Sequence, residues 1–232
     1  MPTFVNSAIV AYSKFAFDTF SNIRAATTGL GSDSTNIILN TATIGISPFF
    51  QGLQRIVMSY DTSTLETLLV DNIISSATIQ VKIGTKTRTQ NLLGDTGGGF
   101  SLVESLIKTS TLNTSKYRLS NLNLTLLADS FNYSDIIDGS IMTFDLNDDG
   151  INSIVTNGTS AFAIIFNADF NNSAAWADSA TILIPLDKTF NQGSLLTVNI
   201  IPFVPTKSFN FAGGIGYRRR RRPFNPASID II

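Results

Sequence analysis

The sequence predicts an all-β protein: an antiparallel β-sandwich of the jelly-roll type with extended N- and C-terminal arms. Short runs rich in Val, Ile, Thr and Phe recur along the chain, and several alternate apolar with polar residues as half-buried strands do. Clusters of Gly, Asn and Asp separate these runs, and helix signals are scarce. Many short strands with turn signals between them are typical of sandwiches and jelly rolls.

Eight strands follow from these patterns in chain order. The run 122–126, LNLTL, alternates cleanly, and 35–44 is rich in β-branched residues. The strands are expected at residues 35–44, 54–60, 77–83, 122–126, 140–144, 160–166, 180–184 and 195–201. The turn clusters between them lie at residues 29–33, 94–99, 145–150 and 191–193.

The remaining segments set the domain boundaries. We expect residues 1–20 to form a strand-like N-terminal arm, residues 21–202 the jelly-roll domain, and residues 203–232 an extended arm rich in Arg, Phe and Gly. Within the domain, residues 101–107 are expected as a short surface helix and 150–155 as one or two helical turns. Residues 92–133 are expected to contain an insertion or a large loop over one sheet edge.

The composition excludes most enzyme chemistry. The 232 residues include no cysteine and no histidine, which removes disulfides, zinc sites with Cys or His ligands, and Ser-His-Asp or Cys-His catalysis. Only two glutamates occur, Glu66 and Glu104, and no motif supports a paired-carboxylate glycosidase. We therefore expect a protein without catalytic activity.

The sequence also bears on the compartment. No basic segment precedes apolar residues at the N-terminus, so residues 1–7 do not have the pattern of a secretory signal. No stretch approaches the roughly 20 apolar residues that a membrane helix needs. We expect synthesis in a host cytoplasm and no membrane partner.

Five consecutive arginines, Arg218, Arg219, Arg220, Arg221 and Arg222, dominate the charge pattern. Without them and Asp230 the chain keeps 11 basic and 16 acidic residues, so its net charge changes from −1 to −5. Gly-rich residues 211–217 precede the run, and the prolines of 223–226 follow it, so neither flank favours a packed helix or a central strand. An acidic body with a basic arm indicates docking onto an acidic partner.

Three interpretations of the arm stay open. The arginines can pair with carboxylates or carbonyls of neighbouring subunits, neutralise nucleic-acid phosphates, or belong to a solvated tail. Phe209, Phe211 and Phe224 are spaced along the arm as anchors onto another surface, and the apolar residues 229–232 can fill a groove of a neighbour. These apolar residues favour a homo-oligomer or a lattice over nucleic acid.

Two further groups of residues are candidate ligand sites. Asp145, Asn147 and Asp149, with Gly150, have the spacing that opens an EF-hand loop, but position twelve is Thr156 instead of a bidentate Glu. The alternatives are a calcium site and a polar turn. The single tryptophan, Trp176, can stack on a sugar ring of a glycan or pack in the core.

Several segments resemble one known family in their order along the chain. Residues 55–63, RIVMSYDTS, and 74–81, ISSATIQV, resemble the opening run of DNRLRE-type jelly-roll modules, which are similar to carbohydrate-binding modules. Residues 144–154, FDLNDDGINSI, and 158–165, GTSAFAII, continue the likeness, and 193–198, GSLLTV, resembles the closing strand. Phe166 stands where the family has an Arg.

The resemblance implies a function outside catalysis. Such modules recur in phage structural proteins and in secreted surface proteins. We expect a virion structural protein of a tailed phage, in the capsid decoration, neck, tail or fibre base, that assembles through its arms. The alternative is a carbohydrate-binding adhesin module on a virion or cell surface, and a third hypothesis is an enzyme that uses Asp, Tyr, Arg and Lys.

Overall fold

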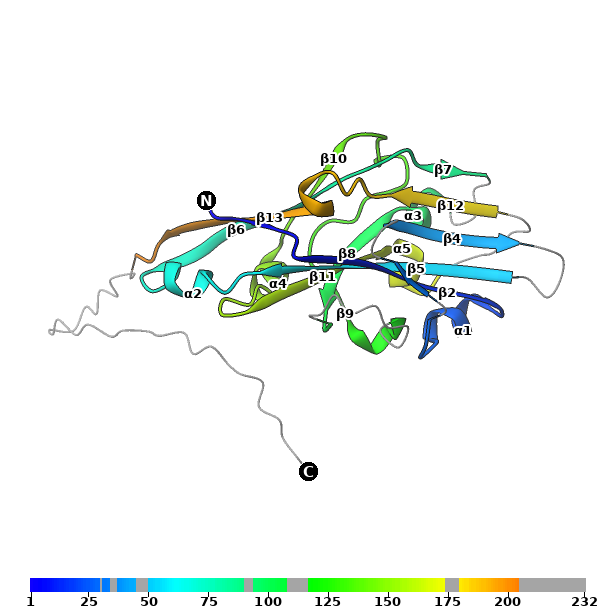
Figure 1. The fold of residues 1–232 in the computed structure, drawn as a ribbon, viewed down its shortest axis with the longest axis horizontal. Helices are drawn as coiled ribbons and strands as arrows, with labels where there is room; N and C mark the ends of the chain where they lie inside the picture. Colours follow the sequence, from blue (N-terminus) through cyan, green and yellow to red (C-terminus); the bar gives the residue numbers. More distant parts are fainter. Residues whose placement is uncertain are drawn as a thin grey trace, which may run out of the picture.

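The protein folds into two antiparallel β-sheets that share one apolar core (Figure 1). The computed structural model describes residues 1–29, 31–33, 37–44, 50–89, 94–107, 117–173 and 180–204. Every strand pair in these residues is antiparallel, so the predicted all-β class is confirmed.

The smaller sheet has four strands in the order β1-β13-β6-β10. Their bounds are Thr3–Val5 for β1, Ser194–Pro202 for β13, Asn72–Lys82 for β6 and Ile141–Asp145 for β10. β6 and β13 pair along their whole lengths, with one irregularity at Asn199/Ile200. This long ladder places the start of β6 beside the end of β13.

The larger sheet follows the order β7-β12-β4-β5-β11-β8-β9; β2 also pairs with β5, and β3 pairs with β2. β5 is the longest strand, and it pairs with β2 on one side and with β11 and β4 on the other. The bounds are Ala8–Phe17 for β2, Gly31–Asp33 for β3, Ile38–Ile44 for β4, Phe50–Asp61 for β5, Thr87–Arg88 for β7, Phe100–Ser105 for β8, Leu122–Leu126 for β9, Thr159–Phe166 for β11 and Ala180–Pro185 for β12.

The larger sheet is buried on both faces over its central strands. Ile56 and Met58 of β5 belong to the main core between the sheets, whereas Val57 belongs to a second apolar cluster on the opposite face. This second cluster comprises Val10, Tyr12, Val57, Val103, Tyr117, Leu122, Ala163 and Ile165. Strands buried on both faces read as continuous apolar runs, which explains why the alternation in the sequence is only partial.

The helices are short and lie at the ends of strands. Their bounds are Phe20–Ala25 for α1, Leu65–Leu68 for α2, Gly94–Gly98 for α3, Asp148–Asn152 for α4 and Asn167–Asn171 for α5, with 3-10 turns at Leu119–Asn121 and Asn191–Gly193. In the described part of the chain, no helix has the length and apolar character needed to cross a membrane.

The eight expected strands all occur, and two other expectations are corrected. Residues 101–107 are not a surface helix, because Phe100–Ser105 is a strand between β11 and β9 that is buried on both faces. The segment expected as an N-terminal arm is strand-like, but β1 and β2 are paired within the two sheets. Ile9 and Ala11 of β2 enter the main core, so this segment belongs to the domain.

Gly99 provides a test of the packing at the start of β8. A Cβ on Gly99 would overlap the carbonyl oxygen of Phe131, which accepts the hydrogen bond from the Phe100 N–H. We predict that Gly99→Ala lowers the free energy of unfolding by about 2 to 3 kcal/mol, as overpacking does. Gly158→Ala is the control, because its Cβ would meet only Val155 at ordinary contact distance. Equal denaturant midpoints for the two variants would contradict this packing.

Candidate functional site

The residues that the sequence marked on the C-terminal arm lie outside the described part of the structure. These are Phe209, Phe211, Arg218 to Arg222 and Phe224, and the same holds for Trp176. Phe203 and Val204 are the last described residues before the arm continues. The candidate site must therefore be built from the surface that the arm leaves and from the polar groups of the two sheets.

The Asp145–Asp149 stretch forms the start of helix α4. The Asn147 Oδ1 accepts a hydrogen bond from the Gly150 N–H at 2.9 Å, and its Nδ2 donates to the Leu126 carbonyl at 2.8 Å. Asn147 is thus the N-cap of α4, a position where Asn is strongly preferred. Asp145 and Asp149 are exposed, and the described residues contain no group of three or more His, Cys, Asp or Glu side chains placed to hold a metal. Of the two alternatives for this stretch, a calcium site and a polar turn, this geometry is that of the polar turn.

A polar hollow of about 230 Å³ lies between α4 and the edge strand β9. Its lining combines two carboxylates, two amides and two hydroxyls with one apolar residue: Glu104, Asn123, Thr125, Leu127, Asp149, Asn152 and Ser153. The Asn123 Nδ2 donates to Glu104 Oε2 at 3.1 Å, and the Thr125 hydroxyl donates to Asn123 Oδ1 at 3.1 Å. These groups can exchange hydrogen bonds with a small polyhydroxylated ligand, but no aromatic ring lines the hollow among the described residues.

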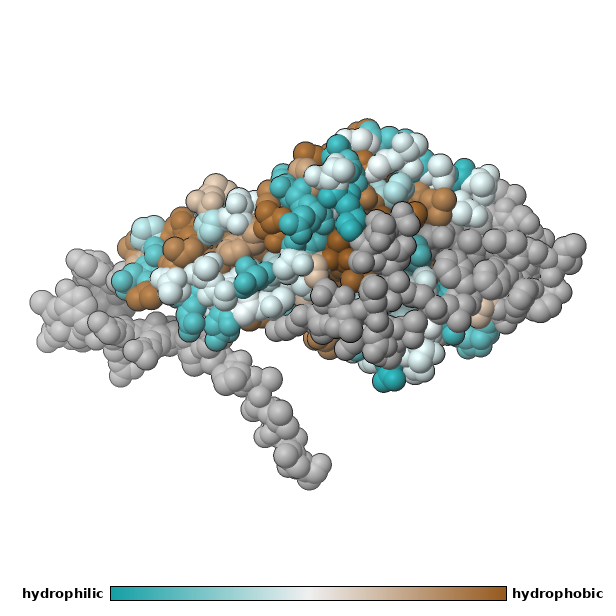
Figure 2. Space-filling view, viewed as in Figure 1, coloured by the Kyte–Doolittle hydropathy of each residue, from teal (hydrophilic) through white to brown (hydrophobic). Residues whose placement is uncertain are grey.

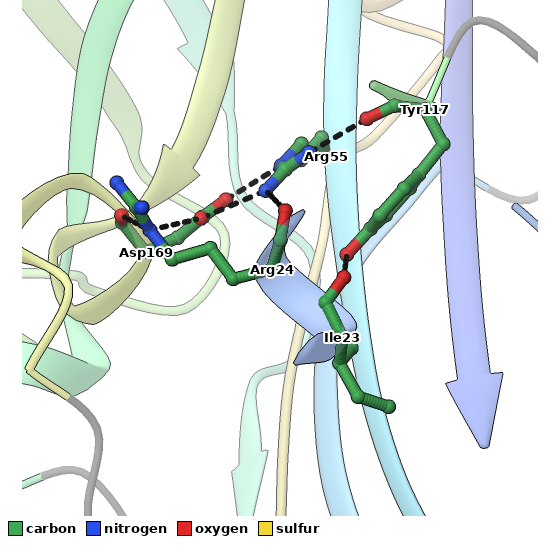
Figure 3. A network of polar contacts seen from close by, with 5 residues as sticks. All are labelled: Ile23, Arg24, Arg55, Tyr117 and Asp169. Atoms are coloured by element: carbon green, nitrogen blue, oxygen red, sulfur yellow. Dashed lines mark hydrogen bonds and ion pairs between the residues drawn. The ribbon is translucent and has the colours of Figure 1, made fainter. Parts of the chain in front are cut away.

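A buried ion pair joins the larger sheet to the helices at one of its ends (Figure 3). The Arg55 guanidinium on β5 binds Asp169 of α5 through Nε at 2.7 Å and Nη2 at 2.9 Å. Its Nη1 donates to the Tyr117 carbonyl at 2.6 Å and Nη2 also donates to the Arg24 carbonyl at 2.9 Å. Arg24 adds a second cation 3.3 Å from Asp169 Oδ1. Four chain segments are thereby tied together.

This pair holds structure together and does not face solvent. Arg55 and Asp169 are 2% and 0% exposed. Burial alone would lower the pKa of Arg55, but the charge of Asp169 and its hydrogen bond prevail and raise this pKa above its ordinary value. The guanidinium also lies 4.4 Å from the centre of the Tyr117 ring, as a cation–π contact. A fully satisfied, inaccessible pair of this kind leaves no group free for a ligand.

The end of β5 carries the residues on which the family resemblance depends, and they too are structural. The Asp61 side chain accepts a hydrogen bond from the Ser63 N–H at 3.1 Å. Hydrogen bonds from Ser63 lower the pKa of Asp61, which keeps this exposed carboxylate charged. The buried Thr62 hydroxyl bonds the Gly158 carbonyl at 3.0 Å and lies 2.9 Å from the Ser160 hydroxyl. These contacts fix the turn between β5 and α2.

The feature with the character of a binding surface is the end of the smaller sheet. Pairing of β10 with β6 stops at Thr78, and pairing of β1 with β13 stops at Thr197. The remaining parts of β6 and β13 form a two-stranded ribbon that projects beside α2 (Figure 1). We call residues 64–76 and 199–204 the tip.

Apolar side chains gather on the tip. Of the eleven large apolar side chains exposed among the described residues, six lie there: Leu68, Val70, Ile73, Ile201, Phe203 and Val204. Ile73 and Ile201 stand directly opposite each other in the ladder. Figure 2 shows this end of the molecule with brown apolar surface around the ribbon. A cluster of this kind marks an interaction surface more often than a single exposed residue does.

The tip is firmly held in place. Leu65 is fully buried in the main core, and Leu69, Ile74 and Ile200 pack against it. The Phe203 N–H donates to the Asp71 carbonyl at 2.9 Å, and the Asn72 Nδ2 donates to the Leu68 carbonyl at 2.8 Å. The outward apolar side chains therefore sit on a preorganised platform, which reduces the entropy cost of binding.

Negative charge surrounds this platform. Residues 56–81 contain three acidic residues and no lysine or arginine. Glu66 and Asp71 of the tip and Asp61 at its base are all exposed. Along β5 and β6 the nearest basic residues are the buried Arg55, six residues before Asp61, and Lys82, eleven residues after Asp71, which correspond to about 20 and 36 Å at ~3.3 Å per residue. The tip is therefore an apolar surface with an acidic rim.

The sequence analysis missed the tip, although two signals for it were present. Three apolar residues in succession, 68–70, stand in an otherwise polar connection. The absence of basic residues from 56–81 is unusual beside the three basic residues of 82–88. Neither signal shows that the start of β6 and the end of β13, more than a hundred residues apart, meet at one end.

No family model, no curated protein and no solved structure matches this chain.

The Arg55 network generates a stability prediction. Asp169→Asn leaves the buried guanidinium without its counter-charge, and we expect a loss of about 3 to 5 kcal/mol in the free energy of unfolding, measured by urea denaturation. The control is Asp187→Asn, which breaks the exposed ion pair with Lys82 (2.9 Å) and should lower the midpoint at pH 7 measurably but far less than Asp169→Asn does. A loss for Asp169→Asn no larger than that of the control would refute this role.

The Lys82–Asp187 pair also predicts a pH dependence. Hydrogen bonds from the Thr189 side chain and Lys82 lower the pKa of Asp187 to about 2. Because this pKa is depressed in the folded chain, the stability that Asp187 contributes is present above pH 4 and is lost as the pH falls towards 2. Urea midpoints of the native chain and Asp187→Asn should converge over this interval. A difference that persists unchanged at pH 2 would contradict the assignment.

Proposed function

We propose that this protein is a structural subunit that joins a larger assembly by burying its tip, and we assign it no catalytic step. The observation that carries the proposal is the apolar, acid-rimmed tip on a rigid platform. The tip is continuous with the C-terminal arm, whose aromatic residues and five arginines supply matching anchors. The tip and the arm together would supply the contacts through which this subunit binds its neighbours.

The order of the strands supports a jelly roll as the finer description of the fold. The first strand pairs with the last in the small sheet, β1-β13-β6-β10, and β5-β11-β8-β9 are neighbours in the large sheet. Along these eight strands the chain changes sheet at every connection except β8 to β9. Such crossing between two four-stranded sheets is typical of jelly rolls, an architecture found in viral capsid proteins and in lectins.

The proposed setting is a virion of a tailed phage. The resemblance of 55–63 and 144–154 to modules of phage structural proteins supports it, as does the low share of charged residues, 14%, which suits a surface that packs against neighbours. The chain would be made in the host cytoplasm and incorporated into the particle. Rigid domains joined by exchanged arms are one way to build a symmetric lattice.

Deletion of residues 208–232 tests this function. We predict that the shortened chain stays folded and soluble, because every strand in the described part of both sheets lies before residue 203. In purified particles from the virus-producing culture, quantitative mass spectrometry should find the full chain in a fixed copy number and the shortened chain not at all. Normal incorporation of the shortened chain, or absence of the full chain from particles, would contradict the proposal.

A second candidate function is glycan binding, and the polar hollow favours it. The hollow between α4 and β9 offers amides, carboxylates and hydroxyls but a volume for roughly one sugar ring, below the ~300 Å³ of ordinary ligand pockets. Without an aromatic platform in its described lining, its affinity for a sugar would be low.

Glycan binding can be tested on an array with the full chain. If a glycan is retained in the hollow, Asn123→Ala should reduce its binding about tenfold, because Asn123 bonds both Glu104 and Thr125 across the lining. Asn199→Ala, outside the hollow, is the control. No retained glycan, or equal binding by both variants, would remove this candidate.

A further inference from the structure

We propose that the tip of one copy binds residues 205–232 of a second copy of this chain. The inference rests on the proposed structural function and deepens it by naming both the docking surface and its occupant. The outward side chains Val70, Ile73 and Ile201 would contact the apolar residues of the neighbour's arm, and the acidic rim would pair with its arginines.

The composition of the two surfaces is complementary. The tip presents apolar side chains beside Asp61, Glu66 and Asp71, with no basic residue within 56–81. Residues 205–232 contain three phenylalanines, five consecutive arginines and an end, 229–232, in which three isoleucines flank the one acidic residue, Asp230. Guanidinium groups form strong, charge-assisted hydrogen bonds with carboxylates. The chain therefore contains, in residues 205–232, a segment whose composition is complementary to the acidic and apolar surface of the tip.

The starting point and the length of the arm allow its arginine run to reach a neighbouring copy. β13 ends at Pro202 in the projecting ribbon, and the Phe203 N–H is bonded to Asp71, so the arm begins beside the acidic rim. Arg218 follows Val204 by 14 residues, which span about 45 to 50 Å when extended. A return of the arginine run to its own rim would close a loop of 14 residues, and mixing of charge-swapped variants distinguishes this outcome from binding to a neighbour. In the extended form the same run reaches past the tip to another copy.

Reciprocal exchange makes the contact useful for assembly. Each copy has one tip and one arm. Every subunit can therefore bind the arm of one neighbour at its tip and place its own arm on the tip of another, which yields closed rings or a continuing array. Two such contacts between the same pair of copies would reinforce each other, because the second forms at a high effective concentration.

Charge reversal in the full chain tests the proposal. We expect the unmodified chain to sediment as a multimer, and the double change Glu66→Lys and Asp71→Lys to raise the dissociation constant of self-association at least about tenfold. Asp129→Lys, an exposed carboxylate outside the tip, is the matched control and should leave the association unchanged. Circular dichroism verifies that each variant is folded. Raising the salt from 50 to 500 mM should weaken association of the unmodified chain more than that of the double variant.

A charge swap distinguishes a direct contact from an indirect effect. Replacing Arg218 to Arg222 with Glu should abolish self-association, and mixing this variant with the Glu66→Lys, Asp71→Lys variant should restore it. Failure of the mixture to associate, or full association of the tip variant alone, would overturn the proposal. Association that nuclease treatment removes would overturn it in favour of nucleic acid.

The same experiments separate this proposal from the broader function. If the full chain is monomeric at tens of micromolar but still enters particles through residues 208–232, the second copy is the wrong occupant and the structural function stands. If the chain self-associates through the tip but is absent from particles, the docking contact stands and the virion function fails.

Discussion

The pairing of β6 with β13 is the constraint on which the rest of the molecule depends. It places Ile79 and Val81 beside Leu196 and Val198 in the main core, and it joins the two inner strands of the small sheet. The same ladder runs on beyond its neighbours, so the strands that close the core also build the projecting tip. Core and docking surface are therefore parts of one element. A change that loosens this ladder would affect stability and assembly together.

Charged residues occur in two different arrangements, a buried ion pair in the interior and exposed carboxylates at the tip. In the interior, Arg55 and Asp169 satisfy each other and hold α1, β5 and α5 together, and burial makes this pair costly to break. At the tip, carboxylates remain exposed, and residues 56–81 contain no lysine or arginine. The first arrangement needs nothing from outside. The carboxylates of the tip lack such a counter-charge within residues 56–81, and this is why an arginine-rich segment would fit them.

The sequence was sufficient for the fold class and for the positions of most strands, because β-branched runs such as 195–201 and clusters such as 191–193 are local signals. It was insufficient where context decides. Phe100–Ser105 lies between two strands with apolar groups on both faces, so its run has no period of two and was taken for a helix. The partners of Arg55 lie 31 to 114 residues away, and the tip joins residues 72 and 202, so neither could be predicted from local patterns.

The most direct measurement is site-specific photo-crosslinking in the full chain. A photoreactive phenylalanine analogue replaces the exposed Val70 at the tip, and equal amounts of isotopically light and heavy protein are mixed before illumination. We expect crosslinked peptides that join the tip of one isotope to residues 205–232 of the other. Crosslinks confined to a single isotope, or to partners other than this segment, would contradict the account.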